Sequence, residues 1–211
     1  MKIAVVGATG KAGSLIVKEA AARGHEVTAI VRDRSKITDA KAKVLEKNLF
    51  DLTFDDLKEN DVVIDAFGTW SEKSLPLHQT SLKHLADILA GSNVRLLVVG
   101  GAGSLYADPT HATRIMDLPD FPEAYKPLAT NMAKAFDALR VRTDIRWTYF
   151  SPAADFSADG PRTGSYALGG EEPVVDGDGK SAISYADYAV AMVDEAESGK
   201  HIGKRFTAAR K

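Results

Sequence analysis

Three glycines near the start of the chain have the spacing of a phosphate-binding turn. Gly7, Gly10 and Gly13 form the pattern G-x-x-G-x-x-G directly after the apolar run 3–6. In such a turn the first glycine lets the chain leave a strand sharply. The second lets backbone approach a pyrophosphate, and the third lets the next helix pack against the sheet. The free N–H groups and positive dipole end of that helix face the phosphates. The pattern predicts a dinucleotide site, and the alternative is a tight turn without a ligand.

The end of the second expected strand bears on which dinucleotide binds. An NAD site usually has an acidic residue there, about 20 residues along the motif, to hold the ribose 2′-hydroxyl. Arg32 occupies this position, between Val31 and Asp33. A guanidinium suits a 2′-phosphate through paired charged hydrogen bonds, which favours NADP while leaving NAD possible. The alternative is a solvated Arg-Asp-Arg turn that does not discriminate.

Other residues with suitable chemistry follow the later strands. Gly68, after Phe67, would allow backbone to approach the cofactor closely, and we expect both residues beside it. Ser104 ends a glycine-rich turn and could reach the nicotinamide or the substrate, with an ordinary turn serine as the alternative. Ser151 and Pro152 should flank the nicotinamide.

Strands and helices alternate along the chain, which predicts an α/β fold with a doubly wound parallel sheet and helices on both faces. The expected strands cover 2–6, 26–31, 43–47, 61–67, 95–99, 146–150 and 205–208. The first helix should end near residue 23, and further helices should cover 75–90, 123–140 and 185–197. In such a sheet, ligands bind beyond the carboxyl ends of the strands, where the residues above are expected.

The composition changes after residue 151. Six glycines and two prolines lie between residues 158 and 180, which predicts loops and short strands. We expect a single NAD(P)-binding domain over 1–211, in which 151–182 form a small loop-rich C-terminal lobe on the substrate side. The alternative is an irregular surface lobe without that role.

Composition and charge narrow the function classes. The net charge of −2 gives no electrostatic reason to expect nucleic acid or an anionic membrane as partner. The absence of cysteine excludes disulfides and thiolate catalysis, and no metal site is expected. No apolar run approaches the length of a membrane span, and the first strand begins at once, so we expect a cytoplasmic protein. We expect it to be a monomer or a homodimer.

The motif 7–13, Gly-Ala-Thr-Gly-Lys-Ala-Gly, resembles that of the atypical short-chain dehydrogenase/reductases, in particular the NmrA-like, NAD(P)H-binding group that includes NADH-flavin reductases. Further matches are the segments 97–105, 147–153, 160–164, 183–189 and 194–195. The resemblance covers essentially the whole chain and extends to biliverdin reductase B. It implies a Rossmann-type fold that binds NADP or NAD through Gly7, Thr9, Gly10, Lys11, Ala12 and Gly13. Members include both reductases and cofactor-sensing proteins with little catalysis.

Many short-chain dehydrogenases use a Tyr-x-x-x-Lys pair to protonate a carbonyl. Tyr125 has Ala129 four residues on, and no other tyrosine has a lysine there. Hydride transfer to a flavin, a quinone or a similar planar aromatic acceptor is less demanding, because alignment dominates and solvent supplies the proton. Ser104 and Tyr125 are therefore the catalytic candidates of a reductase of planar acceptors. The alternatives are a non-catalytic redox sensor and a nucleotide-sugar epimerase or dehydratase, and the missing pair disfavours the latter.

Overall fold

The computed structural model describes residues 1–37 and 42–211, and its centre is an eight-stranded sheet. The strand order is β3-β2-β1-β4-β5-β6-β10-β8, with β8 antiparallel to β10 and the other neighbours parallel. The strands are β1 Lys2–Val6, β2 Glu26–Val31, β3 Lys43–Glu46, β4 Val62–Asp65, β5 Arg95–Val99, β6 Arg146–Ser151, β8 Tyr166–Gly169 and β10 Lys204–Arg210. This order and the flanking helices confirm the predicted Rossmann-type doubly wound sheet.

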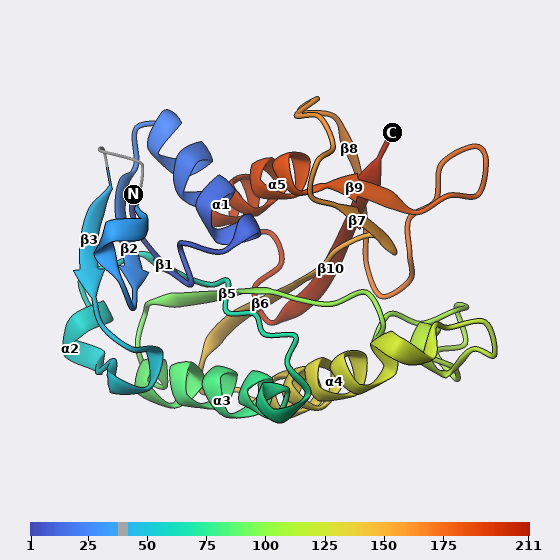
Figure 1. Ribbon diagram of the computed structural model, residues 1–211, viewed down its shortest axis with the longest axis horizontal. Coiled ribbons are helices and arrows are strands. Elements are labelled where there is room, and N and C mark those ends of the chain that lie inside the picture. The colour runs from blue at the N-terminus through green and yellow to red at the C-terminus, as the bar shows by residue number, and fades with distance from the viewer. Residues whose placement is uncertain (38–41) are drawn as a thin grey trace.

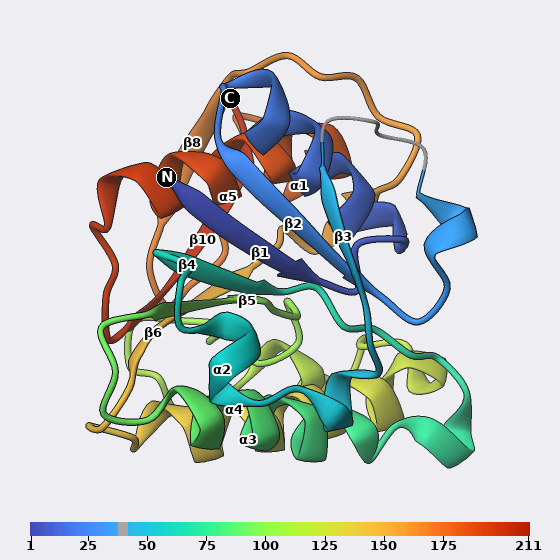
Figure 2. The same cartoon turned by 90° about the vertical axis from the view of Figure 1, so that its left-hand side faces the viewer.

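Helices cover both faces of the sheet (Figures 1 and 2). α1 (Lys11–Ala22) and α5 (Tyr185–Ser198) pack together on one face, and α3 (Leu77–Leu89) and α4 (Lys126–Arg140) pack together on the other. A four-residue helix, α2 (Phe54–Leu57), adjoins α3. Short 3-10 turns are η1 Arg34–Lys36, η2 Leu49–Asp51, η3 Glu72–Ser74, η4 Ile115–Asp117 and η5 Glu123–Tyr125. Within the described ranges, no helix combines the length and apolar character that a membrane span needs.

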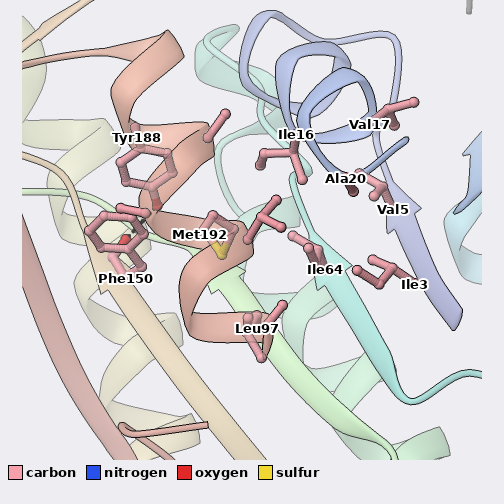
Figure 3. Packing of buried hydrophobic residues seen from close by; sticks show 14 of the residues in the cluster. Ile3, Val5, Ile16, Val17, Ala20, Ile64, Leu97, Phe150, Tyr188 and Met192 are labelled. Atoms are coloured by element: carbon pink, nitrogen blue, oxygen red, sulfur yellow. Dashed lines mark hydrogen bonds between the residues drawn. The ribbon is translucent and has the colours of Figure 1, made fainter. Parts of the chain in front are cut away.

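The core lies in two layers, because successive side chains of a strand point to opposite faces. On β1, Ile3 and Val5 belong to the cluster beneath α1 and α5, whereas Ala4 and Val6 belong to the cluster beneath α3 and α4. Figure 3 shows the first cluster, where Ile16 of α1 and Met192 of α5 point toward the sheet. Both faces of the strand carry apolar residues, as expected of a central parallel strand.

Most expected elements are present, with differences at their ends. β4 stops at Asp65, two residues early, where its carboxylate accepts a hydrogen bond from the Phe67 N–H at 3.0 Å and turns the chain. α4 begins at Lys126 because the preceding residues form η5. α2 was not expected. It is a single turn with a capping box between Thr53 and Asp56, too short to show a helical period.

The region after β6 contains loops and short strands, as predicted. β7 (Asp155–Ser157) and β9 (Ala182–Ser184) form a two-stranded parallel sheet, and β8 joins the edge of the main sheet. In Figure 1 this region lies beside α5, with long loops extending away from the sheet. It is therefore attached both to the sheet edge and to the helix layer.

Candidate functional site

The turn between β1 and α1 has the shape of a phosphate cradle. Gly7 has φ +76°, and a Cβ on it would lie 2.7 Å from the Ala66 carbonyl oxygen. A Cβ on Gly13 would lie 2.3 Å from the Gly7 carbonyl oxygen, so both positions require glycine. The Gly10 N–H donates to that same oxygen at 2.9 Å and closes the turn. Gly7 thus makes the sharp turn predicted for it, and Gly13 allows α1 to pack closely on that turn. The approach of a pyrophosphate at Gly10 remains a prediction.

The first turn of α1 presents unpaired donors at this cradle. No side chain caps the helix at Gly10. Among the described residues, no group accepts hydrogen bonds from the backbone N–H of Lys11, Ala12 or Gly13. These groups and the positive end of the helix dipole suit an anion. A pyrophosphate fits this donor set, because the exposed Gly10 places no Cβ between it and the backbone.

The residues after β2 are arranged in keeping with a 2′-phosphate site. Asp33 accepts hydrogen bonds from the N–H and hydroxyl of Ser35 at 3.0 and 2.6 Å, which caps η1 and lowers the pKa of its carboxyl. Its carboxylate is thus engaged with its own turn. Arg32 directly follows the strand and is exposed. The position that would hold the acid of an NAD site therefore offers a guanidinium to solvent.

An exposed aromatic pair lies beyond the carboxyl ends of β4 and β5. Trp70 is 71% exposed and Tyr125 is 54% exposed, and their ring centroids are 6.4 Å apart in an edge-to-face arrangement. Phe67 instead turns inward and packs edge-on against His78. Gly68 is exposed, and a Cβ on it would meet nothing within 4 Å, so the chain itself does not require glycine there. That open space is compatible with the close approach predicted for the cofactor.

Ser104 is held inside the protein by an arginine from the last strand. It is 4% exposed, and Arg205 donates from Nη1 to its carbonyl oxygen at 2.7 Å and to its hydroxyl at 3.1 Å. Arg205 also pairs with Glu171 of the lobe. Ser104 therefore has a clear structural role, and its catalytic role remains a prediction. The sequence signal of this arrangement is weak, because Arg205 stands between Lys204 and the buried Phe206 in a strand that also ends in Arg210.

The turn after β5 packs against Ala129, the residue at the position where a Tyr-x-x-x-Lys pair beginning at Tyr125 would have its lysine. A Cβ on Gly103 would lie 2.8 Å from the Cβ of Ala129, so α4 approaches this turn closely because both positions are small. The position that carries a lysine in Tyr-x-x-x-Lys enzymes is used here for packing. Tyr125 precedes α4, and its ring contacts Trp70.

Two predicted cofactor residues, Ser151 and Pro152, lie at the end of β6 and are buried. The Ser151 hydroxyl has no hydrogen-bond partner among the described residues. The two residues sit at the predicted edge of the sheet, but their side chains are directed into the protein interior. Contact with a nicotinamide through the backbone of this segment remains a prediction.

Charged side chains connect the lobe (residues 151–182) to the helices α1 and α5. Asp187 of α5 is buried and accepts hydrogen bonds from the Thr163 N–H, the Thr163 hydroxyl and the Gly164 N–H at 2.6–2.8 Å. Arg162 donates two hydrogen bonds to Glu19 of α1, and this pairing lowers the pKa of the Glu19 carboxyl. The loop 160–164 therefore has a fixed position over α1 and α5. Within residues 1–37 and 42–211, no three His, Asp or Glu residues are grouped to hold a metal ion.

The fold and the cradle define an NAD(P)H-binding protein with an oxidoreductase-like Rossmann fold. The chain belongs to the NAD(P)H-binding family, whose model matches residues 7–197. It is 48% identical to the uncharacterized protein YwnB of Bacillus subtilis (strain 168), over 98% of this chain and 97% of that one.

Solved structures of related proteins have the same fold. A candidate NADH-flavin reductase from Streptococcus pneumoniae TIGR4 superposes with a TM-score of 0.96 at 50% identity, covering 100% of both chains. A candidate epimerase from Bacteroides thetaiotaomicron superposes with a TM-score of 0.87 at 38% identity, covering 99% of this chain and 96% of that one. These relatives agree on the fold and differ in the activity that they are named for.

Proposed function

We propose that this protein is an NADPH-dependent reductase that transfers hydride to a flavin, a quinone or a similar planar acceptor. The observation that carries the proposal is the exposed pair Trp70 and Tyr125, at the same edge of the sheet as the phosphate cradle. A large aromatic side chain that is mostly exposed can bury its face against a planar ligand. The name of the Streptococcus pneumoniae relative supports the same acceptor class.

The cofactor would be held at the cradle formed by Gly7, Thr9, Gly10, Lys11, Ala12 and Gly13. The unpaired N–H groups of Lys11, Ala12 and Gly13 would face its phosphates. Arg32 would pair with a 2′-phosphate, which favours NADPH over NADH. When bound, the reduced nicotinamide supplies the hydride. The protein then has to align donor and acceptor and exclude water between them. The lobe, fastened by Asp187 and Arg162, would form one wall of the acceptor site.

A non-catalytic redox sensor is the second candidate. The observation in its favour is that the two groups expected to act on a substrate lack the setting of a catalytic acid: Ser104 is buried at 4% exposure, and Tyr125 has no lysine four residues on. An epimerase, the name given to one relative, would need a base and an acid at the sugar, which the missing pair disfavours.

The decisive experiment measures NADPH oxidation with FMN, FAD, riboflavin and quinones, alongside a binding titration of NADPH. We expect turnover with at least one planar acceptor. Trp70→Ala should lower kcat/KM for that acceptor about tenfold through lost stacking, with the Kd of NADPH unchanged. Phe54→Ala removes an exposed aromatic ring at the opposite edge of the sheet and should leave kcat/KM unchanged. Tight NADPH binding without turnover on any acceptor would favour the sensor.

A further inference from the structure

The last residue of β4, Asp65, carries a buried carboxyl group without a cationic partner. It is 4% exposed, and within the described residues its one hydrogen bond comes from the Phe67 N–H to Oδ1 at 3.0 Å. Burial raises the pKa of this carboxyl to about 6, and the single backbone donor offsets only part of that effect.

The Asp65 carboxyl lines a small cavity of about 20 Å³ between the sheet and the helices α3 and α4. Ser81 of α3 lines the same cavity; its hydroxyl is buried and has no partner among the described residues. A cavity of this volume has room for about one water molecule. Asp65 and Ser81 are polar groups on its wall that could each hydrogen-bond to such a water.

The other groups that face Asp65 do not compensate a negative charge. The titratable ones are His78 of α3 and Tyr149 of β6. Burial lowers the pKa of His78 and raises the pKa of Tyr149 to about 12, so both are neutral near pH 7. The charged groups that influence the pKa of Tyr149 are Arg205, which lowers it, and Asp65 and Asp137, which raise it.

The remaining lining residues of the cavity carry no charge. β5 contributes Val98 and Val99, α4 contributes Met132 and Ala135, and the others are Phe67 and Leu82. The neighbour of Asp65 on β1 is Val6. The side chains that line this cavity therefore do not stabilise an ionised Asp65.

The backbone of Asp65 and of the residue after it pairs with the end of β1, directly before the phosphate cradle. Asp65 is the ladder partner of Val6, the residue immediately before Gly7. The next residue, Ala66, donates its N–H to the Val6 carbonyl at 3.0 Å, and its own carbonyl oxygen would lie 2.7 Å from a Cβ on Gly7. The strand that carries the carboxyl is thus in contact with the turn that receives the phosphates.

We propose that binding of a dinucleotide to the cradle is coupled to proton uptake by Asp65. The phosphates would add negative charge at the turn that the backbone after β4 contacts, and a nearby like charge favours the neutral form of a buried carboxyl. The proton comes from solvent, and Asp65 passes from carboxylate to carboxylic acid with no other bond changed. By linkage, affinity for the dinucleotide falls as pH rises through the range in which Asp65 ionises. This inference rests on the dinucleotide site of the proposed function and requires no acceptor.

The test measures NAD⁺ and NADP⁺ binding by calorimetry from pH 5.5 to 8.5, in two buffers of different ionisation enthalpy. NAD⁺ has no 2′-phosphate, so protons taken up on its binding to the wild type come from the protein. We expect proton uptake, and an affinity that falls about three- to tenfold across this range, because one pKa unit of coupling is tenfold in affinity. Asp65→Asn keeps the shape of the side chain and should abolish both effects for NAD⁺.

Asp61→Asn is the matched control, an exposed carboxyl just before the same strand, and it should retain the wild-type proton uptake. For NADP⁺, the titration of the 2′-phosphate is common to all variants and cancels in the comparison. Equal proton uptake by the wild type and Asp65→Asn would overturn the proposal. If Asp65→Asn does not fold, NAD⁺ binding to the wild type without proton uptake would overturn it equally. Failure to reduce any acceptor would leave this coupling intact, whereas failure to bind either dinucleotide would contradict the site itself.

Discussion

At the scale of single residues, the three glycines of the cradle differ in what a side chain would meet. Side chains on Gly7 and Gly13 would collide with backbone at 2.7 and 2.3 Å, so these glycines are required by the fold itself. Gly10 has ordinary backbone angles (φ −72°), and its nearest neighbour would be 3.2 Å from a Cβ. A substitution at Gly10 can therefore disturb ligand binding without disturbing the fold.

Gly10→Val should abolish dinucleotide binding, because the added side chain would fill the space in which a pyrophosphate meets the backbone. Thermal unfolding should change little, since the position is exposed. Calorimetric titration with NADPH measures the first effect and circular dichroism the second. Gly177→Val is the control, since nothing lies within 4 Å of a Cβ there. Unchanged affinity in Gly10→Val would refute the cradle.

Arg32→Ala tests the choice of cofactor. Removal of the guanidinium should weaken NADPH binding by about 1.5–3 kcal/mol, the value of a charged hydrogen bond, and should leave NADH nearly unaffected. The two dissociation constants, measured on the same preparation, give the difference. Equal losses for the two cofactors would show that Arg32 does not contact a 2′-phosphate.

At the scale of the elements, the close approach of α4 to the turn after β5 determines the chemistry available. Gly103 and Ala129 are both small, and this contact replaces the lysine that would assist a catalytic tyrosine. Tyr125 lies before the first residue of α4, in contact with Trp70. The contact that the structure shows for Tyr125 is made by its ring, and a role for its hydroxyl remains a prediction.

Tyr125→Phe should therefore keep most of the turnover with a planar acceptor, because the ring and its contact with Trp70 are retained. Steady-state kinetics with NADPH and the best acceptor provide the measurement. General acid catalysis contributes about 10²–10⁴-fold, so a loss of that size at unchanged NADPH affinity would identify Tyr125 as an acid after all. Tyr125→Ala is the companion variant and should raise the KM for the acceptor.

At the scale of the whole molecule, the lobe is joined to the helix layer mainly by polar contacts. Asp187 holds the loop 160–164, Arg162 reaches Glu19, and Tyr166 donates to Asp194. Apolar contacts contribute as well, since Phe156 packs against Tyr188. The position of one wall of the proposed acceptor site therefore depends in part on a few partly buried hydrogen bonds.

Asp187→Ala should lower the free energy of unfolding by about 2–4 kcal/mol, because it removes the acceptor of three hydrogen bonds at a buried position. Denaturant titration measures this loss. Asp178→Ala, at an exposed position of the same lobe, should change stability little. Turnover should fall more than NADPH affinity, since the cradle lies on another loop. A larger loss of NADPH affinity than of turnover would show that the lobe does not form a wall of the acceptor site.

Much of the fold was predictable because its signals are local. The glycine spacing, the apolar strands and the amphipathic helices each depend on residues that are close in sequence, so they predicted the doubly wound sheet and the cradle between β1 and α1. The ends of elements were less predictable. β4 stops early through the hydrogen bond from Phe67 to Asp65, and α2 is too short to show a period.

The sequence by itself determined the kind of ligand site, since a phosphate turn is built from neighbouring residues. Only the tertiary structure decided which side chains can act there. Arg205 donates to Ser104 from 101 positions away, and Trp70 contacts Tyr125 across two loops. Asp65 lines a cavity to which the described part of the chain contributes no cation. These relations join residues that are distant in the chain. Their proximity depends on the order in which the strands assemble and on how closely the helices pack, and no local pattern contains that information.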